Sequence, residues 1–236
     1  QLMSMEVLVS SICAEILEKR AIEVRRSILE IGTASPYKAA HYGGALSAVE
    51  IMLSCFLGYL RLDAASFNKD ERDRFVLSKG HGCLALYAVL ENCGLIKRDD
   101  IKFEIDGSTF SGHPVIDRLR FLDFSTGSLG NGLGLAVGAA IAKPNSNIAC
   151  LIGDGELGEG LIWEAARVAA NLHCETLVAI IDCNGFQQTG RTSDVNGAFN
   201  VGAMFRALHW LVFEIDGHDA QAIAHVWGEI KRKGRK

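Results

Sequence analysis

The chain has 236 residues, 49% of them hydrophobic, and its formal net charge is -4. This length can bury the core of one large α/β domain or of two small ones. The slightly acidic balance excludes the broad basic surface that nucleic-acid binding requires. Each long apolar stretch is broken by Gly, Asn or a charge before it could span a bilayer, and no signal peptide is visible, so no membrane association is expected.

The seven cysteines are scattered along the chain and form no C-x-x-C pair. An odd number of cysteines without a spacing pattern is typical of reduced, buried thiols. Because such thiols persist in a reducing compartment, the protein is expected to be cytoplasmic.

Helical and strand-like patterns alternate along the chain, which predicts an α/β fold with a doubly wound, mostly parallel sheet flanked by helices. Helices are predicted from apolar residues at helical spacing, and strands from short apolar runs. The expected helices cover residues 5–32, 45–59, 83–93, 135–143, 157–171, 204–209 and 220–231. The expected strands cover residues 75–77, 147–152, 176–181 and 210–215. Residues 33–44 and 186–199 are expected to be loops, and residues 70–74 a charged connector.

Two polar side chains follow two strands of the predicted sheet. Asp154 lies within Gly153-Asp154-Gly155, and Asn184 follows thirty positions later. The carboxyl ends of parallel strands meet at one edge of a sheet, where ligands bind. A carboxylate and an amide oxygen there suit Mg²⁺ or Ca²⁺, and the nearby glycines and helix N-terminus suit a phosphate. On these residues alone, a plain turn and a metal–phosphate site remain equally open.

Three histidines form a second group of candidates. His41, His81 and His113 each lie in a loop or at an element end, close to Gly or Pro. None has a second histidine at helical ligand spacing, which argues against a zinc site. Glu156 and Glu159 begin the helix after Gly155, where negative charge complements the helix dipole. A proton-relay role is the alternative explanation for these two glutamates.

Taken together, these motifs resemble the transketolase family of thiamine diphosphate enzymes. Residues 152–160 with 182–185 are similar to the thiamine diphosphate motif, a Gly-Asp-Gly followed further on by Asn. Residues 73–81, 111–114 and 125–132 resemble transketolase segments and occur in the same order. The closest similarity is to the N-terminal subunit of transketolases that are split over two polypeptides. The resemblance covers nearly the whole chain.

This resemblance implies the thiamine diphosphate-binding fold as a single domain over residues 1–236, truncated at its C-terminal end relative to the family. Family members continue into another strand and a loop with a further active-site histidine. The sheet is therefore expected to lack an edge strand, and the site a diphosphate contact. A second departure is Ala40-His41-Tyr42, where the family has Gly-His-Pro.

The resemblance also implies a thiamine diphosphate cofactor with Mg²⁺, or alternatively Ca²⁺ or Mn²⁺. The cation would be held by Asp154, Asn184 and the main-chain carbonyl of Phe186, and it would clamp the diphosphate. Residues 127–129 would border the aminopyrimidine and thiazolium rings. The implied cofactor-binding residues are His81, Gly127, Ser128, Leu129, Gly153, Asp154, Gly155, Glu156 and Asn184.

Four side chains are implied as catalytic: His41, His81, His113 and Glu159. By the resemblance, His81 would reach the diphosphate and the substrate side. His41 and His113 would contact the sugar hydroxyls and help to move protons. Glu159 would join an acid network between subunits that supports activation of the aminopyrimidine.

The expected function is transfer of a two-carbon ketol unit between sugars or sugar phosphates, in carbohydrate metabolism of the pentose phosphate type. The family places the activating glutamate in a pyrimidine-binding domain, so a partner chain carrying it is expected, in a heterotetramer. The glycine-rich helix after Ser128 and the helix from Gly158 are interface candidates.

One alternative is a non-catalytic or degenerate cofactor-binding subunit. Another is a related enzyme such as a deoxyxylulose phosphate synthase, which Gly112-His113-Pro114 disfavours. A nucleotide-binding module would need a G-x-G-x-x-G turn after the first strand, which the sequence lacks there.

Overall fold

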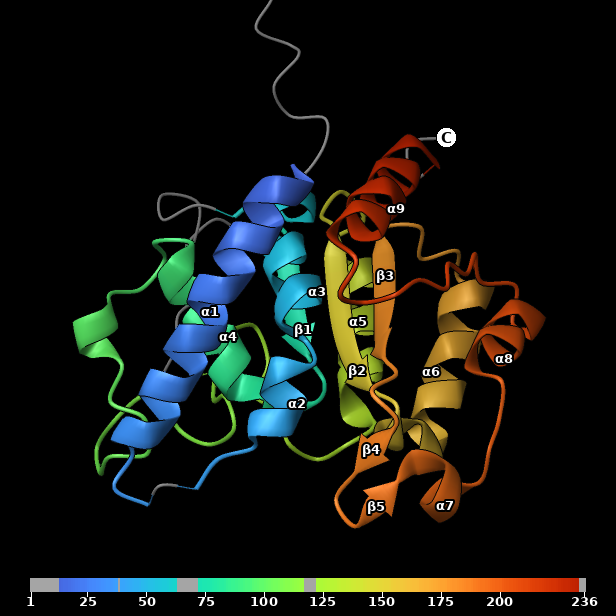
Figure 1. Cartoon of the computed structure of the whole chain (residues 1–236). Coiled ribbons are helices and arrows are strands. Elements are labelled where there is room, and N and C mark those ends of the chain that lie inside the picture. Colours follow the sequence, from blue (N-terminus) through green and yellow to red (C-terminus); the bar gives the residue numbers. More distant parts are fainter. Residues whose placement is uncertain (1–12, 38, 63–71, 117–121, 234–236) are drawn as a thin grey trace, which may run out of the picture.

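The computed structural model describes residues 13–37, 39–62, 72–116 and 122–233, and its centre is a parallel sheet with the order β1-β2-β3 (Figure 1). The strands are β1 (Arg74–Leu77), β2 (Ile148–Gly153) and β3 (Leu177–Asp182). Their register pairs Leu77 with Leu151 and Gly153 with Asp182, so the carboxyl ends lie at one edge. Over the described ranges, no helix is long and apolar enough to cross a bilayer.

Helices cover both faces of the sheet (Figure 1). Those on one face are α1 (Ala14–Ala34), α2 (Tyr42–Leu46), α3 (Val49–Ser54), α4 (Cys83–Asn92) and α9 (Ala220–Lys233). Those on the other face are α5 (Asn131–Ala142), α6 (Gly160–Asn171) and α8 (Val201–Ala207). Because successive strand residues point to opposite faces, Ala149 and Leu151 pack with the first layer, and Cys150 and Ile152 with the second. The predicted doubly wound fold is confirmed.

Most predicted helices have somewhat different bounds in the structure, and two of them differ most. The first begins at Ala14, and residues 5–12 of that prediction lie outside the described residues. The single helix predicted at 45–59 is wrong: α2 ends at Leu46, α3 starts at Val49, and Cys55–Tyr59 is a π-helical turn. The break falls at Ser47, whose hydroxyl donates to Asp182 Oδ2 at 2.7 Å. A tertiary contact at the sheet edge thus interrupts the helical pattern.

The predicted loop at 186–199 is wrong, because it contains regular structure. β4 (Phe186–Gln187) and β5 (Gly190–Arg191) form an antiparallel hairpin, and α7 (Thr192–Asn196) follows it. The segment is polar because most of it lies at the surface, and that polarity conceals the hairpin in the sequence.

The strand predicted at 210–215 is also wrong, since this extended segment joins no sheet in the structure. Its side chains tie it to helices instead of to β3. Trp210 Nε1 donates to Ala166 O in α6 at 2.9 Å, and Glu214 pairs with Arg206 of α8 at 2.5 Å. The short apolar run therefore did not reveal whether a neighbouring strand is available for pairing.

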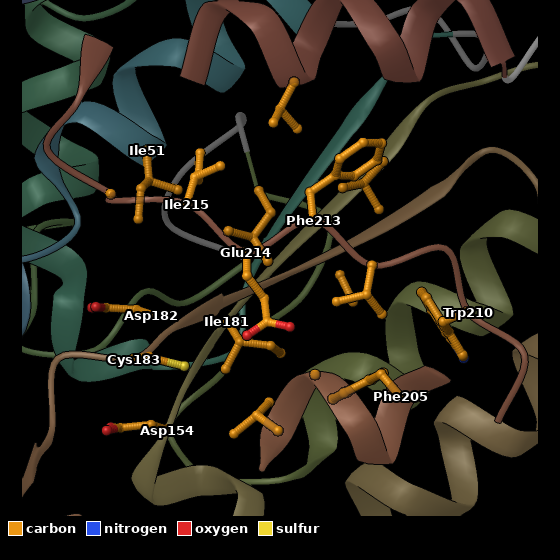
Figure 2. A pocket seen from close by; sticks show the side chains of 18 of the residues that line it. Ile51, Asp154, Ile181, Asp182, Cys183, Phe205, Trp210, Phe213, Glu214 and Ile215 are labelled. Carbon is orange, nitrogen blue, oxygen red and sulfur yellow. The ribbon is translucent and has the colours of Figure 1, made fainter. Parts of the chain in front are cut away.

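A cavity of about 1200 Å³ separates this extended segment from β3. It is lined by residues 177–185 on one side and 209–218 on the other. Figure 2 shows Ile181, Phe213 and Trp210 around this space, with Asp154 and Asp182 along one side. Among the described residues, β3 has β2 as its one strand neighbour. The side of β3 away from β2 therefore faces the cavity.

The predicted charged connector at 70–74 holds a buried carboxylate at the entrance to β1. Residues 70 and 71 lie outside the described residues, whereas the Asp73 side chain is fully buried. Asp73 accepts hydrogen bonds from the main-chain N–H of Arg61 at 2.7 Å and of Asn147 at 2.9 Å. It also accepts from the Arg61 guanidinium at 2.7 Å and from Asn147 Nδ2 at 3.0 Å. Asp73 thus joins the segments that lead into β1 and β2.

Candidate functional site

Asp154 follows β2 directly, and its carboxylate connects the ends of β2 and β3. Its side chain is buried. Oδ1 accepts from the Gly155 N–H at 2.8 Å, while Oδ2 accepts from the Gly185 N–H at 2.8 Å and from Thr192 Oγ1 at 3.0 Å. These bonds hold the turn after β3 against the turn after β2. The two motifs that the sequence placed at neighbouring strand ends therefore meet.

Asn184 lies in the turn after β3, and both ends of its side-chain amide have partners. Nδ2 lies 3.3 Å from Asp182 Oδ2, and Oδ1 accepts from the Phe186 N–H at 2.9 Å. Gly185 has a φ of +78°, a left-handed conformation that favours glycine. One short turn therefore brings the Asn184 amide and the Phe186 main chain beside Asp154.

The β4–β5 hairpin packs closely against the glycine-rich turn. A Cβ on Gly155 would lie 2.8 Å from Gln187 Cβ, so a side chain at this position would displace the hairpin. The Arg191 guanidinium lies 5.3 Å from the centroid of the Phe186 ring, a cation–π contact within the hairpin. Gly155 is therefore required for the close approach of the two turns.

The donor set at this edge fits a hard divalent cation that carries a diphosphate. A carboxylate, an amide oxygen and a main-chain carbonyl are the ligand types that Mg²⁺ and Ca²⁺ prefer. Among the described residues, no three His, Cys, Asp or Glu side chains form a metal-binding group, so a zinc-type site finds no support there. Asp154, Asn184 and Phe186 thus supply the appropriate chemistry without a second cluster that would compete.

The three histidines come from separate segments and gather into one cluster. The ring centroids of His41 and His81 are 5.6 Å apart, and those of His41 and His113 are 6.3 Å apart. Two glycines allow this approach. A Cβ on Gly44 would lie 2.8 Å from His81 Cδ2, and one on Gly127, whose φ is +146°, would lie 3.1 Å from His113 Cδ2.

The environment keeps two of these imidazoles uncharged at neutral pH. Burial lowers the pKa of His81 to about 4, with further lowering by the charge of Lys79 and by the neighbouring histidines. Burial, followed by His41, also lowers the pKa of His113. A neutral imidazole has one donor and one acceptor nitrogen, so each ring can exchange a hydrogen bond with a hydroxyl.

We expect the low pKa of His81 to make stability depend on pH. Between pH 6.5 and about 4 the unfolded chain protonates this group and the folded protein does not. As far as His81 is concerned, the free energy of unfolding is therefore at its full value above about pH 6.5, and it decreases as the pH falls toward 4. Urea unfolding at several pH values in this window measures how steeply the free energy of unfolding depends on pH. His81→Gln should reduce this dependence. An imidazole NMR signal of His81 that titrates near its ordinary pKa would contradict this expectation.

Glu156 is buried and turned into the protein interior. Its carboxylate accepts from the Gly130 N–H at 2.8 Å and from the Gly153 N–H at 3.1 Å, and it accepts the hydroxyl of Ser78. Burial raises its pKa. Glu156 thus fastens the ends of β1 and β2 to the loop before α5. Its contact with a diphosphate stays a prediction.

The loop before α5 lies beside the start of α6. Gly130 has a φ of +86°, and a Cβ there would lie 2.7 Å from Glu159 Cβ. Ser128 and Leu129 are exposed at the tip of this loop, and Glu159 is exposed at the N-terminus of α6. These side chains are therefore accessible at the surface, next to the histidine cluster that contacts Gly127.

The sequence interpretation missed a buried ion pair behind the site. Lys79 Nζ lies 2.5 Å from Asp182 Oδ2, and both side chains are almost inaccessible to solvent. The only signal in the sequence was the position of each residue, at or just after an apolar strand and two positions before a candidate site residue, His81 or Asn184. A charge at such a position is equally compatible with an exposed loop.

Comparisons with known proteins agree with this geometry. The structure superposes on transketolase from Leishmania mexicana with a TM-score of 0.85 and 28% identity, over 92% of this chain and 35% of that chain. Fold and site thus define an α/β protein of the thiamine diphosphate-binding class. Residues 17–236 match the family described as "Transketolase, thiamine diphosphate binding domain". The chain therefore belongs to the transketolase family.

Two relatives that are subunits of transketolases are similar to this chain over most of their own length. One subunit of the apulose-4-phosphate transketolase of Actinobacillus succinogenes is 36% identical over 93% of this chain and 81% of its own. A 6-deoxy-6-sulfo-D-fructose transketolase subunit of a Clostridium species is 36% identical over 92% of this chain and 80% of its own. The expected resemblance to the N-terminal subunit of split transketolases is confirmed. By comparison, the chain spans about a third of the length of the Leishmania enzyme.

Proposed function

We propose that this chain is the diphosphate-binding subunit of a two-chain enzyme that transfers a two-carbon ketol unit between sugars. The observation that carries the proposal is the meeting of Asp154 and Asn184 at adjacent strand ends, close to a cluster of three histidines. The contacts of Lys79 connect the two groups, because its ammonium meets Asp182 and lies 3.8 Å from the Cβ position of Gly44, which borders His81.

In this proposal, Asp154, Asn184 and the Phe186 carbonyl hold Mg²⁺, and the amides near Gly155 bind the diphosphate. Thiamine diphosphate, when bound, supplies the carbanion chemistry that cleaves and forms the carbon–carbon bond. The chain's own residues anchor and orient. His41, His81 and His113 exchange hydrogen bonds with the sugar hydroxyls and hold protons near them. The exposed loop 127–129 borders the cofactor rings.

The partner in this proposal is a separate chain that carries the pyrimidine-binding domain, in a cytoplasmic heterotetramer with two copies of each. The outer face of α5 and α6 is the surface proposed for it. Gly134, Gly138 and Ile141 are exposed on α5, and Leu161 and Val168 are exposed on α6. Glu159 lies at the end of this surface, where an acid network between chains would begin. Small residues on α5 allow a partner helix to approach closely.

The proposed substrates are ketoses with an anionic group at the far end of the sugar. This class is supported by the names of two relatives, one of which acts on a sugar phosphate and the other on a sugar sulfonate. In this proposal the far anionic group is bound mainly by the partner chain, since the histidine cluster of this chain is suited to hydroxyls.

We expect no ketol transfer from the purified chain with thiamine diphosphate and Mg²⁺, and activity once an equimolar pyrimidine-domain subunit is added. The physical reason is that the reacting end of the cofactor needs groups from both chains. Mass spectrometry of products from a ketose phosphate donor and an aldose phosphate acceptor measures transfer, and calorimetry measures cofactor binding. Ketol transfer by the single chain would contradict the two-chain proposal. Cofactor binding without activity in any mixture would instead favour the non-catalytic alternative.

A further inference from the structure

We propose that the buried Lys79–Asp182 pair is a positioning device for the cation site, which fixes the direction of the Asn184 side-chain amide. The inference rests on the proposed metal site and adds two residues to it, neither of which touches the metal. The inference is based on two contacts at the end of β3. The Asp182 carboxylate accepts hydrogen bonds from both the Lys79 ammonium and the Asn184 amide nitrogen.

An amide can ligate a hard cation through its oxygen but not through its nitrogen. The direction in which Asn184 is turned therefore decides whether it can be a ligand. In the structure, Nδ2 lies 3.3 Å from Asp182 Oδ2, and Oδ1 accepts from the Phe186 N–H at 2.9 Å. Reversing the amide would set two donors against each other at Phe186 and two acceptors against each other at Asp182. Both ends thus specify the same orientation, with the oxygen on the side of the turn that carries the Phe186 main chain.

Asp182 can direct this amide because its own carboxylate is held from several sides. Oδ2 receives Lys79 Nζ at 2.5 Å and Ser47 Oγ at 2.7 Å. Its main-chain carbonyl accepts from the Asp154 N–H at 3.1 Å, which fixes the strand end against the other proposed ligand. The lysine supplies the positive charge that a buried carboxylate requires.

Lys79 is itself held in one place by the elements around it. Its side chain is almost inaccessible to solvent and lies close to Gly153 at the end of β2 and to Gly82 in the turn Gly80–Gly82. A Cβ on Gly153 would lie 3.8 Å from Lys79 Cβ, and one on Gly82 would lie 3.5 Å from Lys79 Cε. The pair therefore has little freedom to rearrange, and a metal ligand held by such fixed outer contacts is already oriented before the cation arrives.

Two double variants separate positioning from plain structural support. Lys79→Met/Asp182→Asn removes both charges but keeps an oxygen acceptor for the Asn184 amide. Lys79→Met/Asp182→Leu removes both charges and the Asp182 acceptor, so that Asn184 Nδ2 keeps only its longer contact with Ser47 Oγ at 3.5 Å. The probe is Mn²⁺ in the presence of thiamine diphosphate, followed by the loss of the free-ion EPR signal, on the form of the protein that binds the cofactor, single chain or complex.

We expect the first double variant to bind Mn²⁺ within about threefold of the unaltered protein and the second to bind about 10–100-fold more weakly, as for the loss of other outer contacts of a metal site. Thermal unfolding without metal is measured for both, so that the comparison is made at equal folded fraction. Equal Mn²⁺ affinity of the two double variants would overturn the inference. It would show that the pair merely stabilises the fold.

A conservative single variant keeps the inference testable if the leucine variant does not fold. Asn184→Asp adds a negative charge to the cation site, but it removes the N–H donor that Asp182 receives. Positioning predicts weaker Mn²⁺ binding, and recovery in Asp182→Asn/Asn184→Asp, which exchanges donor and acceptor. Stronger binding by Asn184→Asp alone would overturn the inference. If Asn184→Ala leaves Mn²⁺ affinity unchanged, the metal site itself is misplaced, and the proposed function fails rather than this step alone.

Discussion

Asp154→Ala should abolish the metal-dependent binding of thiamine diphosphate, with an affinity loss of at least about 100-fold. The substitution removes the one carboxylate among the three proposed oxygen ligands. It also releases the N–H groups of Gly155 and Gly185 and the hydroxyl of Thr192, which now hold the two turns together. Calorimetric titration of the cofactor with and without Mg²⁺ measures the loss.

Thr192→Val is the matched control for this prediction. It removes one hydrogen bond to Asp154 Oδ2, at 3.0 Å, while leaving the carboxylate in place. Metal-dependent binding by this variant should remain within a few fold of the unaltered protein, since one neutral hydrogen bond contributes about 1 kcal/mol. Persistent metal-dependent binding by Asp154→Ala would show that the diphosphate lies elsewhere on the molecule.

Asp73→Ala is expected to cause a large loss of stability without touching the site, about 2–5 kcal/mol, because two main-chain N–H groups lose their acceptor. The carboxylate is fully buried and accepts from two main-chain N–H groups, the Asn147 amide and the Arg61 guanidinium. Removing it takes away the acceptor of the two main-chain N–H groups at the entrance to β1 and β2, whereas the Arg61 guanidinium is 67% exposed and still donates to Asn145 O. Urea unfolding measures the loss, and Tm should fall by roughly 10 °C.

Glu30→Ala provides the comparison for Asp73, because Glu30 also pairs with an arginine, Arg98, at 2.8 Å. The Glu30 side chain is 56% exposed, and Arg98, which is 34% exposed, keeps its pair with Glu91 and its contact with water when Glu30 is removed. We expect a cost below about 1 kcal/mol for such a surface pair. Similar losses from Asp73→Ala and Glu30→Ala would mean that burial of Asp73 has no energetic consequence.

The pattern of residues along the chain correctly predicted the positions of Asp154 and Asn184, which depend only on the two strands that they follow. Because consecutive parallel strands end at the same edge, the spacing of Asp154 and Asn184 sufficed to place them side by side. The same argument could not place His41, His81 and His113. They come from three loops whose paths depend on close contacts at Gly44 and Gly127, and the family resemblance suggested their grouping.

The wrong predictions have a common physical origin in tertiary contacts. Residues 210–215 form a short apolar run like that of a buried strand, but such a run does not reveal whether a neighbouring strand is available. The helix predicted at 45–59 breaks where Ser47 turns to Asp182. Lys79 was overlooked because a lysine after a strand is usually exposed, and the sequence does not indicate that this one is paired within the core.

The cavity beside β3 has a consequence for how the protein behaves in concentrated solution. A strand edge with unpaired main-chain groups is a template on which a strand of another molecule can assemble. Residues 177–181 carry no charge, and charges are the usual safeguard against such assembly, with Asp182 following only at the strand end. Within the described residues, the free edge of β3 is therefore the place where a strand of a second molecule could pair with this sheet.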